Sequence, residues 1–291
     1  MRVCSLLPSA SEIVAALGHA DSLVGVSDEC RWPPELAGKP VVTAARIDAA
    51  ALSSREIDDA VRASLLDGGS PYAIDAALIE ALEPDLIVTQ DLCTVCAVSG
   101  DDVANTLPLE VEVLSLDPRT LADVAETFRV LARRLGTPER GEDLARTFDG
   151  TMASVATAVQ ERPPRRVFFA EWLDPPFTAG HWIPEMIRLA GGEDVLGQAG
   201  RPSRSTTWHK ALAHEPELVV LAPCGFGAAE AARRAAGLDL GVPAIVVDGD
   251  GYYSCPGPRL ADGVRQLGHL LHPEVVDDPA MDALELVRAS A

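Results

Sequence analysis

Short runs of β-branched or apolar residues alternate with helical patterns along most of this chain, and no other feature limits its fold as strongly. A short continuous apolar run predicts a strand that is buried on both faces. Apolar residues that recur every three or four positions predict helices that cover such strands. In the first part of the chain, strands are predicted at 3–7, 23–26, 86–89 and 111–115, and helices at 11–17 and 74–82. This alternation is typical of an α/β fold with a mainly parallel sheet.

The character of the sequence changes after Asp117-Pro118. Residues 120–161 have helical spacing almost throughout, with a predicted break at 136–138 and an end at Pro163-Pro164, since proline cannot continue a helix. A second alternating block follows, with strands predicted at 166–170, 218–222 and 244–247 and helices at 183–190, 209–213 and 258–271. We therefore predict an N-terminal α/β lobe at 1–118, a connecting helical segment at 119–164 and a C-terminal α/β lobe at 165–291.

Two local signals add detail to this prediction. The sequence Glu-Pro-Asp-Leu-Ile-Val at 83–88 recurs as Glu-Pro-Glu-Leu-Val-Val at 215–220. Because the residue before a proline disfavours helical backbone, both copies predict a helix that ends before the proline and a strand that starts after it. Ser9 and Glu12 have the spacing of a capping box, which predicts that Ser9 caps the first helix.

The chain is strongly acidic, with a formal net charge of -20 at pH 7 over 291 residues. Such a charge repels phosphate backbones, so a nucleic-acid partner is not expected. No apolar stretch approaches the roughly 18 to 20 residues that span a bilayer, so membrane insertion is not expected either. The first residues lack the apolar run of a signal peptide, which predicts a cytoplasmic protein. Arg233 and Arg234 are predicted to lie on a solvated helix face.

Five of the six cysteines follow the ends of predicted strands, namely Cys30, Cys93, Cys96, Cys224 and Cys255. In a reducing compartment, cysteines are free thiols, metal ligands or catalytic groups rather than disulfides. Because ligands gather at the carboxyl ends of parallel strands, these five are candidates for a functional site. The sixth, Cys4, lies inside a predicted strand and is expected to pack in the core as a small apolar side chain.

The pair Cys93-Thr94-Val95-Cys96 has a spacing that redox pairs, zinc sites and iron–sulfur sites all use. No second Cys-x-x-Cys completes a zinc ribbon. A four-thiolate site would need Cys93, Cys96, Cys255 and either Cys30 or Cys224, and it would hold zinc or an iron–sulfur cluster. A thiol-lined site for an organic or corrinoid ligand is the alternative. Thiol–disulfide exchange through Cys93 and Cys96 is a third.

Three stretches resemble a known family: VCSLLPSASEIVAALGHADSLVGVSDECRWPPEL at 3–36, LEPDLIVTQ at 82–90 and RVFFAEWLDPPFTAGHWIPEMIRLAGGEDVLG at 166–197. They are similar to class III periplasmic binding proteins for cobalamin, haem and ferric siderophores, with the cobalamin branch nearest. The resemblance implies two Rossmann-like lobes with parallel sheets, joined by a long rigid helix, and a ligand cleft between them.

The resemblance also implies which residues line that cleft. Carried over by position, they are Ser9, Glu29, Trp32, Asp91, Glu171, Trp172, His181, Trp182, Tyr252 and Tyr253. An inserted helix and loop at 53–75 would add Tyr72 to them. A corrinoid is a broad apolar disc fringed with amides, and aromatic faces suit it better than charged side chains do.

We therefore predict a binding protein without enzymatic activity, which takes a corrinoid of the cobalamin type and acts as a cytoplasmic carrier, scavenger or sensor. The alternative is a Cys-ligated zinc or iron–sulfur protein on the same scaffold, with redox or small-molecule chemistry. A further alternative is the substrate-binding component of an ABC importer. Two departures argue against docking on a permease: no signal peptide is recognised, and 207–210 lacks the acidic residue that transporter-linked members carry there.

Overall fold

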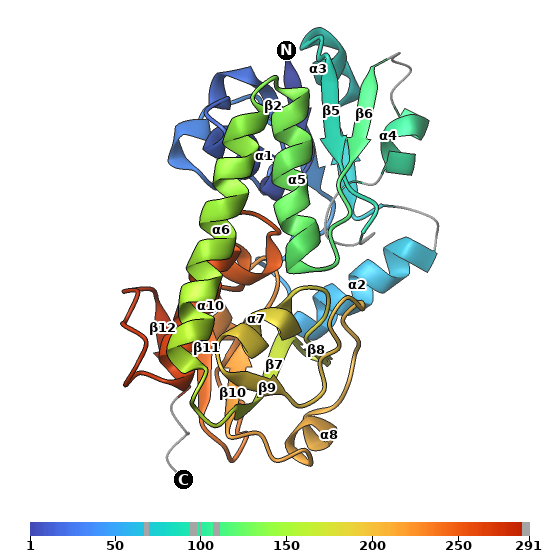
Figure 1. Cartoon of the computed structure of the whole chain (residues 1–291). Helices are drawn as coiled ribbons and strands as arrows, with labels where there is room; N and C mark the ends of the chain where they lie inside the picture. Colours follow the sequence, from blue (N-terminus) through green and yellow to red (C-terminus); the bar gives the residue numbers. More distant parts are fainter. Residues whose placement is uncertain (67–69, 93–97, 99, 107–110, 287–291) are drawn as a thin grey trace. The chain divides into compact units, whose positions relative to one another are not determined.

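The computed structural model describes residues 1–66, 70–92, 98, 100–106 and 111–286. The chain separates into two compact units. Unit 1 comprises Met1–Pro118 and Asp123–Ala145, and unit 2 comprises Arg119–Ala122 and Arg146–Ala291. Each unit combines helices with a sheet, so the predicted α/β fold class is confirmed (Figure 1).

Unit 1 is built on a four-stranded sheet in which all strands run parallel. The strand order is β2–β1–β5–β6, with β1 at Val3–Ser5, β2 at Leu23–Val26, β5 at Leu86–Thr89 and β6 at Glu112–Ser115. The central strands β1 and β5 are buried along their whole length, as expected where helices cover both faces of a sheet. All four are the predicted strands.

Helix α1 (Pro8–Ala16) begins before the predicted capping box. Its N-cap is Leu7, which provides no side-chain capping bond. Pro8 takes the first helical position, where its fixed φ fits and its missing N–H costs nothing. Ser9 and Glu12 therefore lie inside the helix, both buried, and the predicted capping box is wrong.

A short hairpin accompanies the main sheet of unit 1. Its strands, β3 (Thr43–Ala45) and β4 (Tyr72–Ile74), pair antiparallel, and the chain between them contains α2 (Ser54–Leu66). The helix predicted within 53–75 is therefore confirmed. The helix α3 (Ala76–Ala81) follows, with Asp75 as its N-cap. An open hollow of about 450 Å³ lies on this hairpin, lined by Val41, Thr43, Ala44, Ala73, Ile74, Asp75 and Ala76.

The remaining helices of the first half are α4 (Gly100–Thr106), α5 (Leu121–Arg134) and α6 (Pro138–Val159). The predicted break between α5 and α6 is confirmed. It occurs at Gly136, whose φ of 74° ends α5, and Pro138 then opens α6. Figure 1 shows α6 as one uninterrupted helix, of which residues up to Ala145 belong to unit 1 and the rest to unit 2.

Unit 2 contains a six-stranded sheet with a parallel centre. Its strands are β7 (Arg165–Leu173), β8 (Pro176–Thr178), β9 (Gly192–Asp194), β10 (Leu218–Leu221), β11 (Ala244–Val247) and β12 (Ala283–Glu285). The strands β9, β7, β10 and β11 run parallel, whereas β8 and β12 are antiparallel to their neighbours. The predicted parallel strands are confirmed, but the sheet as a whole is mixed. The short turn at Asp174-Pro175 can connect β7 only to an antiparallel neighbour.

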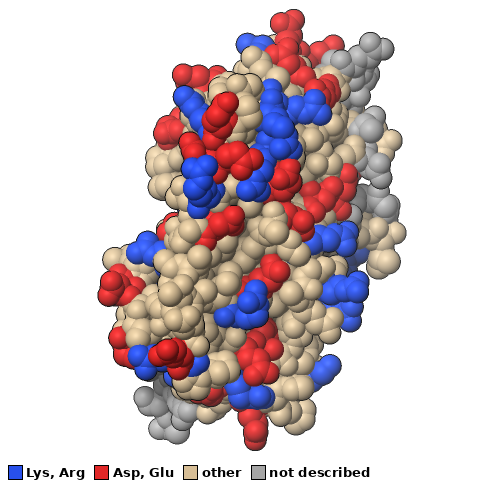
Figure 2. All heavy atoms as spheres, in the orientation of Figure 1, with Lys and Arg blue, Asp and Glu red and all other residues tan. Residues whose placement is uncertain are grey.

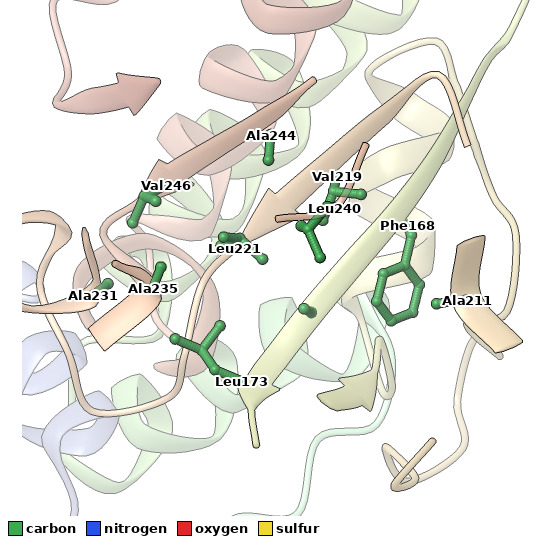
Figure 3. Packing of buried hydrophobic residues seen from close by; sticks show 11 residues of the cluster. Phe168, Leu173, Ala211, Val219, Leu221, Ala231, Ala235, Leu240, Ala244 and Val246 are labelled. Carbon is green, nitrogen blue, oxygen red and sulfur yellow. The ribbon is translucent and has the colours of Figure 1, made fainter. Parts of the chain in front are cut away.

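Apart from the portions of α5 and α6 that belong to unit 2, its described part contains the helices α7 (Ile183–Leu189), α8 (Trp208–Leu212), α9 (Ala228–Ala235) and α10 (Leu260–Leu271), and a short π-helix at Asp250–Ser254. Side chains from β7, β10, β11, α8 and α9 form one core (Figure 3). Its buried members are Phe168, Ala170, Leu173, Ala211, Val219, Leu221, Ala231, Ala235, Leu240, Ala244 and Val246. Trp208 packs edge-on against Phe168, with ring centres 5.8 Å apart, which fixes α8 on β7.

Both copies of the repeated Glu-Pro motif adopt the same backbone. Glu83 and Glu215 have φ values of 43° and 49°, in the left-handed region that non-glycine residues rarely occupy. Each lies between the end of a helix and the start of a strand, β5 in unit 1 and β10 in unit 2. The predicted helix end and strand start are thus confirmed in both units.

An arginine stabilises each copy of this turn. The guanidinium of Arg2 donates to the carbonyl of Leu82, at the end of α3, at 2.7 Å. The guanidinium of Arg166 donates to the carbonyl of Glu215, in the turn after α8, at 3.2 Å. The backbone N–H of each arginine donates to the acid that follows the proline, Asp85 at 2.6 Å and Glu217 at 3.0 Å. The two units therefore start equivalent strands in the same way.

Acidic and basic side chains are interspersed on the face seen in Figure 2, so this face carries no patch of one sign. Among the described residues, no helix combines the length and the apolar character that crossing a bilayer requires.

Asp194, the last residue of β9, is a buried carboxylate with an incomplete set of partners. Its Oδ1 accepts the N–H groups of Leu196 at 2.9 Å and Gly197 at 2.5 Å. Its Oδ2 is buried and lacks a hydrogen-bond partner among the described residues. Burial raises the pKa of Asp194 to about 6, against the opposing effect of the two N–H donors.

We expect Asp194→Asn to raise the free energy of unfolding at pH 7 by up to about 3 kcal/mol, because the folded wild-type protein must there keep a buried carboxylate ionised. The gain shrinks as the pH falls through about 6, where Asp194 becomes neutral in the folded state. It vanishes below the pKa of the unfolded chain. Urea unfolding from about pH 4 to pH 8 measures this dependence.

The matched control is Glu193→Gln, which removes an exposed carboxylate from the same strand. Its effect should be small and nearly independent of pH over this range. An Asp194→Asn protein with the same pH dependence as the wild type would contradict the assignment.

Candidate functional site

The carboxyl ends of β7 and β10 lie side by side in unit 2. Ala170 pairs with Leu221, the last residue of β10, and β7 continues beyond this pair to Leu173. The N–H of Cys224, in the loop after β10, donates to the carbonyl of Glu171 at 3.0 Å. This bond fixes the loop against the end of β7, at the edge where ligands bind in parallel α/β sheets.

A β-bulge between Ala170 and Trp172 changes the direction of the side chains at the end of β7. Strict alternation would turn Trp172 to the same face as Phe168 and Ala170, which belong to the core. Instead Leu173 joins that core, and Trp172 remains partly exposed. Bulges commonly redirect a side chain in this way next to functional sites.

The partner of Trp172 is Phe226, from the loop after β10. Their ring centres are 5.8 Å apart, and the planes are tilted by 34°. The carbonyl of Phe226 accepts the N–H of Asp250 at 3.2 Å, so the loop after β11 joins the same edge. That loop carries Tyr252, which is partly exposed and lies under the guanidinium of Arg259.

Phe226 was not among the residues predicted for the site, and the prediction that Arg234 lies on a solvated helix face is wrong. The guanidinium of Arg234 lies 4.1 Å from the centre of the Phe226 ring, and only 3% of this side chain is exposed. Arg233 is 63% exposed, as predicted. The burial of Arg234 could have been predicted from its position three residues after Ala231, because this spacing places both on the buried face of α9.

Glu171 and His181 lie near the same edge. Glu171 accepts the N–H of Gly180 at 2.6 Å, and the N–H of His181 donates to the carbonyl of Arg201 at 2.6 Å. Burial, and secondarily the charge of Arg119, lowers the pKa of His181. The imidazole is therefore neutral at pH 7 and offers a nitrogen lone pair. We refer to Glu171, Trp172, His181, Phe226 and Tyr252 as the unit 2 edge.

Trp182 and Tyr253 belong to the interior of unit 2. They are 5% and 0% exposed, and the indole N–H of Trp182 donates to the carbonyl of Tyr253 at 2.8 Å. The hydroxyl of Tyr253 donates to Gln266 at 2.7 Å, and its ring packs on Phe169. Burial raises the pKa of Tyr253 well above its usual range. These two residues anchor the loops that carry His181 and Tyr252.

Unit 1 has its own set of residues at the end of β2. Asp28 accepts the hydroxyl of Thr43 at 2.5 Å and the N–H of Ala45 at 2.8 Å, which attaches β3 to this loop. Glu29 accepts a hydrogen bond from an exposed arginine at 3.2 Å. Trp32 is 45% exposed, a large fraction for an indole.

The other predicted residues of unit 1 range from buried Ser9 to exposed Asp91. Ser9 is buried in α1, and Tyr72 packs from β4 against the core of unit 1. Asp91 accepts the N–H of Gly100 at 2.7 Å and the hydroxyl of Ser115 at 2.9 Å. Both of its carboxylate oxygens therefore hold the ends of neighbouring elements together.

The cysteines do not form a metal site among the described residues. Cys4 is buried in the core of unit 1, as predicted, and Cys30, Cys224 and Cys255 form no disulfide among the described residues. No group of three or more His, Cys, Asp or Glu residues in the described ranges is placed to hold a metal ion. The predicted ligands Cys93 and Cys96 lie outside those ranges.

Cys30 is moreover a poor source of thiolate. Its sulfur lies 3.0 Å from the hydroxyl of Ser11, and burial raises its pKa to about 11. The hydrogen bond from Ser11 only partly offsets that effect. The metal-free thiol of Cys30 is therefore protonated at neutral pH.

Comparison with known proteins gives consistent results. A sequence model of the family described as "Periplasmic binding protein" matches residues 3–239. A vitamin B12-binding protein of Pectobacterium atrosepticum is 25% identical over 282 residues, which cover 91% of this chain and 86% of that protein.

Two solved structures share the fold. The periplasmic vitamin B12 binding protein of Vibrio cholerae has a TM-score of 0.66 at 23% identity, covering 94% of this chain and 96% of that one. A periplasmic haem-binding protein of Pseudomonas aeruginosa has a TM-score of 0.70 at 19% identity, covering 100% and 99%.

The environment of Cys30 predicts slow alkylation. With its pKa near 11, Cys30 should react with iodoacetamide at pH 8 about a hundredfold more slowly than an unperturbed thiol. The partly exposed Cys224 should react before Cys30, and peptide mass spectrometry measures the order. In guanidinium, the same peptides should react at equal rates. Equal rates in the folded protein would contradict the burial of this thiol.

Proposed function

Because the chain belongs to the periplasmic binding protein family, we propose that it binds a corrinoid of the cobalamin type. The matched residues 3–239 include every strand of unit 1 and the strands β7 to β10 of unit 2. Relatives named vitamin B12-binding proteins support this ligand class.

The observation that carries the proposal is the aromatic character of the unit 2 edge. Trp172, Phe226 and Tyr252 are all partly exposed at the carboxyl ends of neighbouring strands. A corrinoid is a flat and largely apolar disc, so aromatic faces bind it with a large gain from burial. Its peripheral amides find hydrogen-bond partners in backbone groups, which are plentiful in loops at strand ends.

Haem is the second candidate, and His181 is the residue that favours it. Similar solved structures include periplasmic haem-binding proteins. A neutral imidazole is a good ligand for iron, and the lowered pKa of His181 keeps it neutral at pH 7. Haem and corrinoids are both flat metal-bearing macrocycles, so the same aromatic rings suit either.

The role that follows is binding without chemistry. A carrier, a scavenger and a sensor all require a site that holds its ligand reversibly and leaves it unchanged. The cytoplasmic location and the absence of docking on an ABC permease stay predictions of the sequence.

Ligand titration tests the proposal. Cyanocobalamin added to the purified protein should quench tryptophan fluorescence and shift the visible absorbance of the ligand, because an indole of the unit 2 edge would lie against the macrocycle. Haemin is titrated in parallel. A response to haemin alone would select the second candidate, and no response to either ligand would contradict the proposal.

Trp172→Ala should weaken binding of the preferred ligand by at least about tenfold, because a large aromatic contact is lost. Trp208→Phe is the control, since Trp208 packs in the core of unit 2 and should leave the affinity unchanged. Dissociation constants from the same titration give the comparison. Equal losses in both variants would point to a general effect on folding and not to a contact at the site.

A further inference from the structure

The side chain of Arg234 is buried although it carries a charge. Only 3% of its side chain is exposed, whereas 63% of Arg233, its neighbour on α9, is exposed. Removing a guanidinium from water costs free energy unless other contacts compensate for the lost hydration. The contacts of Arg234 therefore indicate what its position serves.

The contacts of the guanidinium include a hydrogen bond and a ring contact. Its Nε donates to Glu230 at 2.7 Å, and its central carbon lies 4.1 Å from the centre of the Phe226 ring. The second contact has the geometry of a cation–π interaction, which gains strength when the cation is out of water.

Phe226 needs a support of this kind. It lies between Gly225, with a φ of 78°, and Gly227, and both glycines have open space where a side chain would begin. Such flanking glycines leave a loop considerable conformational freedom. Backbone bonds to Glu171 and Asp250 hold this loop, but they leave the side-chain torsions of Phe226 free. The ring packs against the core of unit 2, and the guanidinium over its face restricts it further.

The ring of Phe226 in turn contacts Trp172, with the centres 5.8 Å apart. A continuous series of contacts therefore runs from Glu230 through Arg234 and Phe226 to Trp172. Its middle member, the side chain of Arg234, is buried, and it ends on the partly exposed indole of the unit 2 edge.

We propose that Arg234 is a positioning residue, which fixes Phe226 and, through it, the indole of Trp172 in the orientation that a flat ligand requires. This inference rests on the proposed function, since it assigns the residue that prepares the same binding surface. Rings that are already ordered lose little rotamer freedom when the ligand binds, and this preorganisation increases affinity.

The variant that tests this role is Arg234→Met, which keeps a long apolar side chain and removes the planar cation. Arg233→Met is the matched control, because Arg233 shares the partner Glu230 but is exposed. We expect Arg234→Met to weaken cyanocobalamin binding by about tenfold, mainly through faster dissociation, while Arg233→Met has little effect. Wild-type affinity in a folded Arg234→Met protein would overturn the proposal.

A second variant distinguishes an effect that acts through the Phe226 ring from a general loss of packing. Phe226→Leu keeps an apolar side chain of similar size but removes the ring through which Arg234 acts. If the proposal holds, adding Arg234→Met to Phe226→Leu weakens binding no further. Fully additive losses in the double variant would overturn it.

A measurement without ligand separates this inference from the proposed function. The fluorescence of Trp172 is isolated by subtracting the signal of matched Trp172→Phe variants. We expect acrylamide to quench Trp172 more strongly in Arg234→Met than in the wild type, and equally in Arg233→Met and the wild type. If the wild type binds neither cyanocobalamin nor haemin, the proposed function fails, and this comparison still decides the role of Arg234. Unchanged quenching in Arg234→Met would overturn it.

Discussion

The parallel register of β7 on β10 is the constraint on which the unit 2 edge depends. Because Ala170 pairs with Leu221 at the end of β10, the loop that follows β10 runs beside Glu171, and the N–H of Cys224 reaches the carbonyl of Glu171. That bond directs the following loop so that Phe226 lies beside Trp172. A shift of one residue in register would turn these side chains to the opposite faces and separate the rings.

A bulge at the end of β7 allows the strand to contribute to the core and also to present an exposed indole. The strand has to bury Phe168 and Ala170 in the core, yet it also presents an indole at its end. The extra residue between Ala170 and Trp172 gives the core position to Leu173. The cost is a local interruption of the ladder, which the neighbouring β8 accommodates through its own pairing with β7.

The loop residues of the chain divide into those that bind each other and those with exposed surface. Trp182, Tyr253 and Asp91 direct their polar atoms to partners within their own unit and stabilise the loops. Trp172 and Tyr252 keep part of their rings exposed. A surface of aromatic rings supported from behind fits a flat ligand.

The sequence alone determined the α/β class, the parallel strands and the break before α6, because these follow from local apolar periodicity, glycine and proline. It also located the Glu-Pro turns, since their geometry depends on adjacent residues. The tertiary structure decided which aromatic rings are exposed, why Pro8 and not Ser9 begins α1, and that Arg234 is buried against Phe226. The exposure of the rings and the burial of Arg234 depend on contacts between residues distant in sequence. The start of α1 depends on whether Pro8 or Ser9 takes the first helical position. The spacing of residues along the chain predicts neither.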